Sequence, residues 1–166
     1  MMSTHPPGSP IRRDRLLKRP HTDTYRTDRK LHEPVLCKDC GAVFIGGRWQ
    51  WANAAPEQSD ETRCPACKRI HDRVPAGFLT LRGKFFETHR EEIMRLVNNH
   101  VEHQRLKHPM QRIIDATPLP GGGIELSFTE YHLPKGVGEA VKHAYQGELN
   151  INFANESGQE RVSWER

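Results

Sequence analysis

The four cysteines of this chain constrain its fold more than any other feature. They form two C-x2-C pairs, Cys37 with Cys40 and Cys64 with Cys67, and 23 residues separate the pairs. A C-x2-C turn directs two thiolates at one centre, and two such turns complete the tetrahedral all-thiolate shell that zinc takes at structural sites. We therefore predict one structural Zn²⁺, held by all four cysteines, with no coordination position left for a substrate.

Two disulfides and a redox C-x-x-C motif are the alternative uses of such pairs. Disulfides are typical of exported chains, and residues 1–8 contain no apolar stretch of the kind that a signal peptide needs. A thioredoxin-like motif follows a strand in a βαβ unit and does not come as a matched pair. The spacing favours zinc over both alternatives.

Charge is distributed unevenly along the chain. The net charge of +4 divides into +4 for residues 1–33, +3 for residues 34–84 and −3 for residues 85–166. Such asymmetry favours a polyanionic partner for the basic half, with nucleic acid the first candidate and anionic lipid the second. No apolar run approaches the length of about 18 residues that a membrane span needs. We expect a cytoplasmic protein without a membrane partner.

Three segments are predicted, and the first is a basic arm of residues 1–33. Its prolines and scarce apolar residues indicate disorder in the free protein, and basic arms of this kind become ordered on RNA. A terminus that only increases solubility is the alternative. The predicted RNA-contacting residues of the arm are Arg12, Arg13, Arg15, Lys18, Arg19, Arg26, Arg29 and Lys30.

The second segment, residues 34–83, is predicted to be a small zinc-ribbon-like module. Residues 43–45 and 48–51 have the pattern of a hairpin that turns at Gly46 and Gly47. Trp49 and Trp51 share one face, and we expect one to pack over the cysteine turns and the other to stack on an unpaired base. The predicted RNA-contacting residues of the module are Arg48, Trp49, Trp51, Arg63, Lys68, Arg69 and Arg73; simple solvation of the basic ones is the alternative.

The third segment, residues 84–166, is predicted to be an α+β domain of order α-β-β-α-β-β, with an antiparallel sheet covered by helices on one face. A helical stripe ends near Lys107, and Thr88-x-x-Glu91 matches a capping box. The strands are expected at residues 112–117, 124–128, 149–153 and 161–164, with a second helix from Leu133 to Gly147. This helix should turn Val137, Ala140, Val141 and Ala144 inward, and the predicted core of the sheet is Ile124, Leu126, Phe128, Leu149, Ile151 and Phe153.

No catalytic residues are predicted, and no small-molecule substrate is expected. His100 and His103 share a helix face, but a second metal site needs a third convergent ligand, and a solvated helix face explains both histidines. Residues 121–123 join two strands and lack the Lys-Ser/Thr that follows a phosphate loop. The zinc site takes every cysteine, so no thiol is left as a nucleophile.

Several runs resemble a family of uncharacterised bacterial zinc-ribbon proteins: residues 35–43, 47–51, 64–69, 75–78 and 143–148. More distantly, the cysteine turns, residues 123–128 and the helix with Ala140 and Val141 are similar to the N-terminal half of the archaeal and eukaryotic large-subunit export adaptor, which is named after nonsense-mediated decay. The additional cysteine pairs and downstream β-barrel domains of that adaptor have no counterpart here. The adaptor binds the joining face of the large ribosomal subunit, so the resemblance implies contact with the ribosome rather than chemistry.

Our leading hypothesis is a non-enzymatic, ribosome-associated factor. Its zinc module and arm would contact rRNA of the large subunit, and its α+β domain would contact protein or occlude a functional site. Occlusion suits a hibernation (silencing), protection or assembly factor. The alternative is a protein-interaction or regulatory adaptor, in which zinc only folds the module and no RNA is bound.

Overall fold

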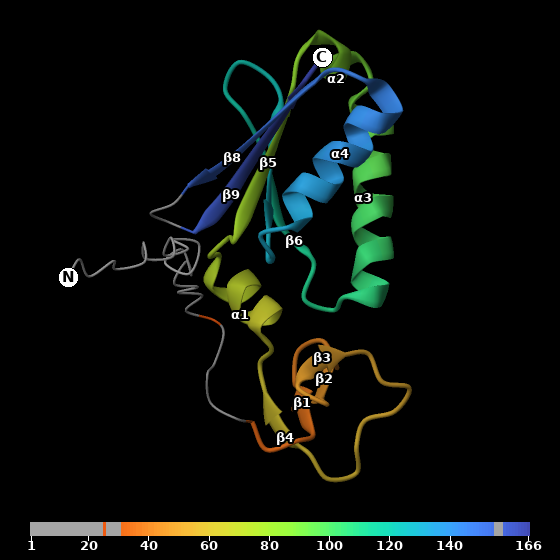
Figure 1. Ribbon diagram of the computed structural model, residues 1–166, viewed down its shortest axis with the longest axis vertical. Helices are drawn as coiled ribbons and strands as arrows, with labels where there is room; N and C mark the ends of the chain where they lie inside the picture. Colours follow the sequence, from red (N-terminus) through yellow and green to blue (C-terminus); the bar gives the residue numbers. More distant parts are fainter. Residues whose placement is uncertain (1–24, 26–30, 155–157) are drawn as a thin grey trace, which may run out of the picture.

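The computed structural model describes Tyr25, residues 31–154 and residues 158–166, and in this part of the chain it has two sheets and four helices (Figure 1). We call residues 31–76 the N-terminal lobe and residues 77–166 the C-terminal lobe. Helix α1 (Pro65–Asp72) lies between the two sheets in Figure 1. The protein is therefore a mixed α+β protein, as predicted, while the basic arm falls almost wholly outside the described residues.

The N-terminal lobe is built on a small four-stranded sheet. Strands β1 (Val35–Cys37), β2 (Val43–Ile45), β3 (Arg48–Gln50) and β4 (Asp60–Thr62) lie in the order β3-β2-β1-β4. The β2–β3 hairpin turns at Gly46 and Gly47, whose φ values of 63° and 77° favour glycine. The Glu33 carboxylate accepts hydrogen bonds from both turn amides, at 2.8 and 2.9 Å. The predicted hairpin is confirmed.

The C-terminal lobe contains a five-stranded sheet of order β6-β7-β5-β9-β8. Its strands are β5 (Gly77–Arg82), β6 (Ile113–Pro118), β7 (Ile124–Phe128), β8 (Glu148–Ala154) and β9 (Gln159–Glu165). The short α2 (Lys84–Thr88) leads into α3 (Arg90–Lys107), and α4 (Leu133–Tyr145) packs beside α3. Figure 1 shows α3 and α4 on the same side of the sheet. The four strands and two long helices expected in this region are confirmed.

The predicted antiparallel sheet is wrong in one respect, because the prediction omitted its central strand. β5 pairs antiparallel with β7 but parallel with β9, so the sheet is mixed. Residues 77–82, which we placed in the zinc module, therefore belong to the sheet of the C-terminal lobe. The alternation of buried Gly77, Leu79 and Leu81 with half-buried Phe78 and Thr80 is the pattern that marks this strand.

Three smaller expectations are also corrected. Thr88 does not cap α3; its hydroxyl donates to the Lys84 carbonyl oxygen at 2.9 Å, and α3 follows His89 without a side-chain cap. Ile151 is 43% exposed rather than in the core. Ala144 is exposed as well. Helix α1, which spans residues 65–72, had not been predicted.

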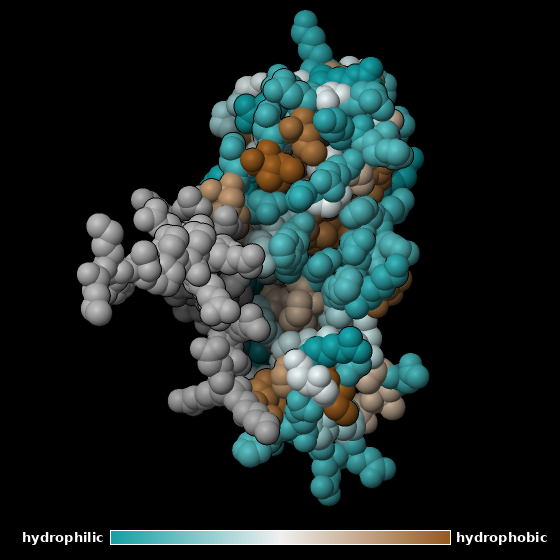
Figure 2. Space-filling model, viewed as in Figure 1, coloured by the Kyte–Doolittle hydropathy of each residue, from teal (hydrophilic) through white to brown (hydrophobic). Residues whose placement is uncertain are grey.

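The main core lies between the C-terminal sheet and α3 and α4. Its side chains come from alternating sheet positions such as Leu79 and Leu126 and from helix positions such as Ile93 and Val137, all with 0% exposure. Trp164 is also fully buried and donates its indole N–H to the Gln146 carbonyl oxygen at 2.6 Å. Figure 2 shows a largely hydrophilic surface on the viewed face. Among the described residues, no helix is both long and apolar enough to cross a membrane.

Candidate metal centre

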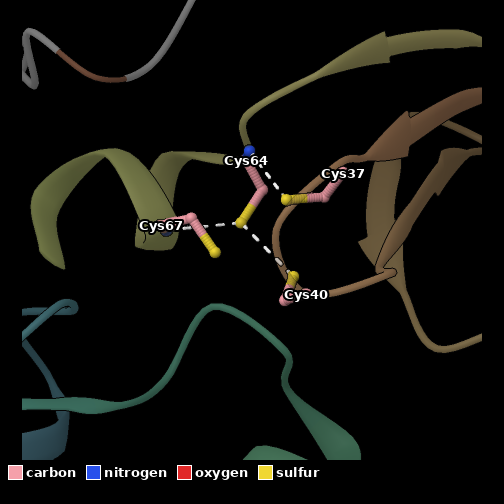
Figure 3. Close-up of side chains that lie close together, drawn as sticks. All are labelled: Cys37, Cys40, Cys64 and Cys67. Atoms are coloured by element: carbon pink, nitrogen blue, oxygen red, sulfur yellow. Dashed lines mark hydrogen bonds between the residues drawn. The ribbon is translucent and has the colours of Figure 1, made fainter. Parts of the chain in front are cut away.

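The four cysteine side chains converge where the two lobes meet. Their sulfur atoms all lie within 4.8 Å of one another, and the Sγ atoms of Cys40 and Cys64 are 3.8 Å apart. Figure 3 shows them pointing toward one centre: Cys37 from the end of β1, Cys40 from the loop that follows it, and Cys64 and Cys67 from the start of α1. The structure therefore brings together all four predicted ligands.

Local backbone geometry creates the first cysteine turn. Cys37 ends β1, and its amide donates to the Ala42 carbonyl oxygen at 2.8 Å. Gly41 has a φ of 79°, which lets the chain close the turn and donate its own amide to the Cys37 carbonyl oxygen at 3.0 Å. The two thiols are thus held on one side of a closed loop.

The second turn differs because a helix begins inside it. Cys64 is the N-cap of α1, and its sulfur accepts a hydrogen bond from the Cys67 amide at 3.4 Å. The Cys64 amide donates to the Cys37 sulfur at 3.2 Å. Pro65 occupies the first helical position, where its missing N–H costs nothing. The positive end of the helix dipole also favours thiolate at this cap.

This geometry fits a single tetrahedral metal ion. With Zn–S bonds of about 2.3 Å, sulfur ligands at the corners of a tetrahedron lie about 3.8 Å apart. That spacing agrees with the Cys40–Cys64 separation, whereas a disulfide needs about 2.0 Å. All four cysteines are free, so the disulfide alternative is not what this structure forms. Four thiolates fill a tetrahedral shell with protein ligands.

Protons compete with a metal for these thiols. Burial raises the pKa of the Cys67 thiol to about 11, although the hydrogen bond from Arg112 acts in the opposite direction. Burial likewise raises the pKa of Cys64 far above its usual range. At Cys37 burial is outweighed by backbone hydrogen bonds, chiefly from the Cys64 amide, which lower the pKa to about 7. A metal must displace protons from at least Cys64 and Cys67 at neutral pH.

Arg112, which the sequence did not indicate as a site residue, also contacts the cysteine sulfur atoms. Its side chain reaches from the C-terminal lobe and donates to the Cys40 sulfur at 3.1 Å and to the Cys67 sulfur at 3.2 Å, with Cys64 at 3.8 Å. Arg112 is only 8% exposed. Burial acts to lower its pKa, but the hydrogen bonds to Cys40 and Cys67 prevail and raise it. The guanidinium therefore remains a cation beside the cysteine sulfur atoms.

The backbone around Arg112 is held in place by Thr129, the residue that follows β7. The Arg112 amide donates to the Thr129 hydroxyl oxygen at 2.9 Å, and the Thr129 amide donates to the Arg112 carbonyl oxygen at 3.0 Å. The Thr129 hydroxyl in turn donates to the Met110 carbonyl oxygen at 2.6 Å. The guanidinium Nε–H donates to the Pro109 carbonyl oxygen at 2.8 Å. Arg112 is thus fixed by the C-terminal lobe.

The predicted difference between the two tryptophans is wrong. Both Trp49 and Trp51 are half-buried and pack against the cysteine cluster. The Trp51 indole N–H donates to the Arg105 carbonyl oxygen of α3 at 2.7 Å, and the Arg105 guanidinium lies 5.7 Å from the ring centroid. Trp49 packs against Phe44, with ring centroids 5.5 Å apart. Neither tryptophan is fully exposed, and stacking on a base by either ring remains a prediction.

The predicted basic contacts divide into engaged and exposed side chains. Arg69 is 9% exposed and donates to the Val74 carbonyl oxygen at 2.9 Å, and Arg63 is paired with Asp39. Arg48 and Arg73 are exposed, and Lys68 is half-buried. The predicted contacts of the arm, from Arg12 to Lys30, lie outside the described residues. RNA contact by any of these residues remains a prediction.

A second group of polar side chains lies along α3, away from the cysteines. His100, His103 and Glu92 line an open groove of about 540 Å³ between α3 and Ala140 of α4. Burial, and then the nearby His103, lower the pKa of His100, so it is neutral at physiological pH. Among the residues that the structure describes, only the four cysteines form a cluster that could hold a metal.

Comparisons with protein families, with curated proteins and with solved structures each found no match.

Proposed function

We propose that this protein is a non-enzymatic zinc-binding factor of the cytoplasm that contacts ribosomal RNA through its basic N-terminal half. The observation that carries the proposal is the four-cysteine site, because helix α1, which begins at this site, is also contacted by Tyr25 of the basic arm. Zinc is the ion favoured by four thiolates with tetrahedral spacing. A shell filled by four protein ligands supports folding and leaves no position for substrate, so the role of zinc is structural.

The contact between the arm and α1 is made by Tyr25. Its hydroxyl donates to the Asp72 carboxylate at 3.0 Å, and the Arg69 guanidinium lies 4.6 Å from its ring centroid. In the sequence, Arg19, Arg26, Arg29 and Lys30 lie within six residues of Tyr25. The exposed Arg73 ends the same helix. These sequence neighbours of Tyr25, together with Arg73, supply positive charge that a phosphate backbone can bind.

We further propose that the protein contacts the large subunit and has a hibernation, protection or assembly role. These two proposals rest on the resemblance of the cysteine turns to those of the export adaptor and on the charge asymmetry between the two halves of the chain. The C-terminal lobe, whose residues 85–166 carry a net charge of −3, would face protein or cover a functional site on the ribosome. No small-molecule substrate is part of this function.

Cosedimentation with purified ribosomal subunits over a salt series tests the proposal. A variant with Arg12, Arg13, Arg15 and Arg19 changed to glutamine should bind more weakly, and the slope of log K against log salt should fall by about 3. The matched control changes Lys107, Lys135, Lys142 and Arg161 to glutamine, all exposed cations of the C-terminal lobe. Equal losses in both variants, or no loss in the first, would refute specific contact by the arm.

The adaptor hypothesis is the second candidate, and one observation favours it. Trp51 and Arg69 donate hydrogen bonds within the protein and Arg63 is paired with Asp39 at the surface, so three of the predicted RNA contacts already have partners inside the chain. If neither subunit is bound at low salt while the protein is folded and loaded with zinc, the adaptor hypothesis replaces the RNA-binding one.

A further inference from the structure

We propose that Arg112 is an outer partner of the metal centre, so that metal binding and docking of the two lobes form one coupled event. The inference requires a metal at the four cysteines but does not depend on RNA binding. Arg112 belongs to the C-terminal lobe, but its guanidinium donates hydrogen bonds to two sulfur atoms of the N-terminal lobe, those of Cys67 and Cys40.

The shape of the side chain suits this contact. Two terminal nitrogens of the guanidinium reach two different sulfur atoms, those of Cys67 and Cys40, at 3.2 and 3.1 Å, while Nε is bonded to the Pro109 carbonyl oxygen. A planar fork of donors can satisfy separated acceptors simultaneously, which a lysine ammonium cannot do from the same position. The contact is therefore specific to arginine.

The opposite charges of Arg112 and the metal-bound thiolates stabilise each other. Four thiolates around Zn²⁺ carry a net charge of −2, and at this depth a negative charge is costly unless a cation lies close. Arg112, 8% exposed, supplies that cation. The guanidinium in turn needs the thiolates, because a buried charge that loses its partner is strongly destabilising. Each lobe thus stabilises a charge that belongs to the other.

Two further contacts around the centre join the lobes. Trp51 of the N-terminal lobe bonds to the Arg105 carbonyl oxygen of α3, and Met110 packs against the cysteine cluster. If metal binding strengthens this docking, docking must strengthen metal binding by the same factor. Metal release is then expected to free residues 109–112 and separate the lobes, beyond unfolding the cysteine turns.

Zinc affinity of the full-length chain tests the coupling. Wild type, R112K, R112M and the control R161M, whose exposed arginine lies near Glu125, are compared by chelator competition, with circular dichroism to verify folding. R112M should bind zinc about 10–100-fold more weakly, since loss of outer hydrogen-bond partners has effects of this size. R112K should fall between R112M and wild type, and R161M should match wild type. A folded R112M with wild-type affinity would overturn the proposal.

The Co²⁺-substituted protein provides a readout that general destabilisation does not move. Hydrogen bonds from Arg112 withdraw electron density from the thiolates, so R112M should shift the sulfur-to-cobalt charge-transfer band to lower energy. An unchanged band would show that the guanidinium does not act on the metal ligands.

A measurement on the wild type covers the case in which R112M fails to fold. Hydrogen exchange of the full chain, with and without added Zn²⁺, should show metal-dependent protection at the Arg112 and Thr129 amides as well as at the cysteine turns. Protection confined to residues 35–67 would overturn the proposal. None of these measurements involves RNA, so failure here and failure of the proposed function are distinguished.

Discussion

Replacement of Cys64 by serine should separate the contribution of the metal from that of the local fold. Cys64 has 0% exposure, provides one ligand and caps α1 by accepting the Cys67 amide. Serine is a good N-cap, so C64S can keep the cap while removing the ligand. The change in stability therefore reports the loss of metal binding.

The free energy lost with the metal should be larger than the remaining contacts of the N-terminal lobe can offset. Structural zinc contributes about 10–16 kcal/mol in small zinc-binding peptides, which is as large as the whole stability of a typical domain, about 5–15 kcal/mol. The N-terminal lobe has a small cluster of buried residues, centred on Cys37, Ala42, Cys64, Ala66 and Cys67. Without metal, this lobe should unfold. The C-terminal lobe has its own core and should remain folded, with Arg112 released into solvent.

The selective unfolding of the N-terminal lobe is measured by the zinc content and hydrogen exchange of C64S. Wild type and T62S, which keeps all four ligands, are the controls. We expect loss of zinc, loss of protection in residues 35–62, and retained protection in β5, β7 and β9. A zinc-free C64S that still protects residues 35–62 would show that the lobe folds without metal. Loss of protection throughout residues 77–166 would show that the two lobes unfold as one unit.

Two further predictions concern single side chains. W51F removes the indole N–H that donates to the Arg105 carbonyl oxygen. Urea unfolding should show that the free energy of unfolding falls by about 1–3 kcal/mol. A free energy of unfolding equal to that of wild type would refute a role of Trp51 in joining the lobes. Glu160 is 7% exposed, burial raises its pKa, and its Oε1 atom has no hydrogen-bond partner. Because the pKa of Glu160 is raised in the folded state, its contribution to stability is present below the usual pKa of glutamate and is lost as the pH rises through the folded-state pKa. E160Q should therefore raise Tm at pH 7 but not at pH 4. An equal effect of E160Q at both pH values would contradict a raised pKa for Glu160.

Periodic segments and the cysteine spacing were sufficient to predict much of this fold. The β7 strand, the β2–β3 hairpin and the helix from Leu133 were predictable because alternation, turn glycines and a first-turn proline act locally. The convergence of the cysteines was predictable for a different reason, since two matched pairs with no spare thiol leave few other arrangements. Local chemistry determines these features.

The unpredicted features depend on contacts between distant residues. The parallel pairing of β5 with β9 joins Leu79 to Val162, and no local pattern specifies a partner that far along the chain. Arg112 is similar, because its sequence position indicates only the start of a strand, while its acceptor Cys40 lies 72 residues away. The exposure of Trp51 depended on α3, which supplies the acceptor for its indole. In each case tertiary packing decides the role of the residue.

The packing of both tryptophans bears on the kind of RNA contact that the hypothesis predicts. With both rings packed near the cysteines, the RNA-binding hypothesis rests on charge, which implies steep salt dependence and little base preference. The metal would then contribute by fixing the position of α1, because this helix begins at the ligand Cys64 and its last residue, Asp72, accepts a hydrogen bond from Tyr25. On this hypothesis a metal at the four cysteines, Arg112 and α1 together link Tyr25 of the arm to the C-terminal lobe. Loss of zinc should therefore weaken ribosome binding even though every basic residue of the arm is retained.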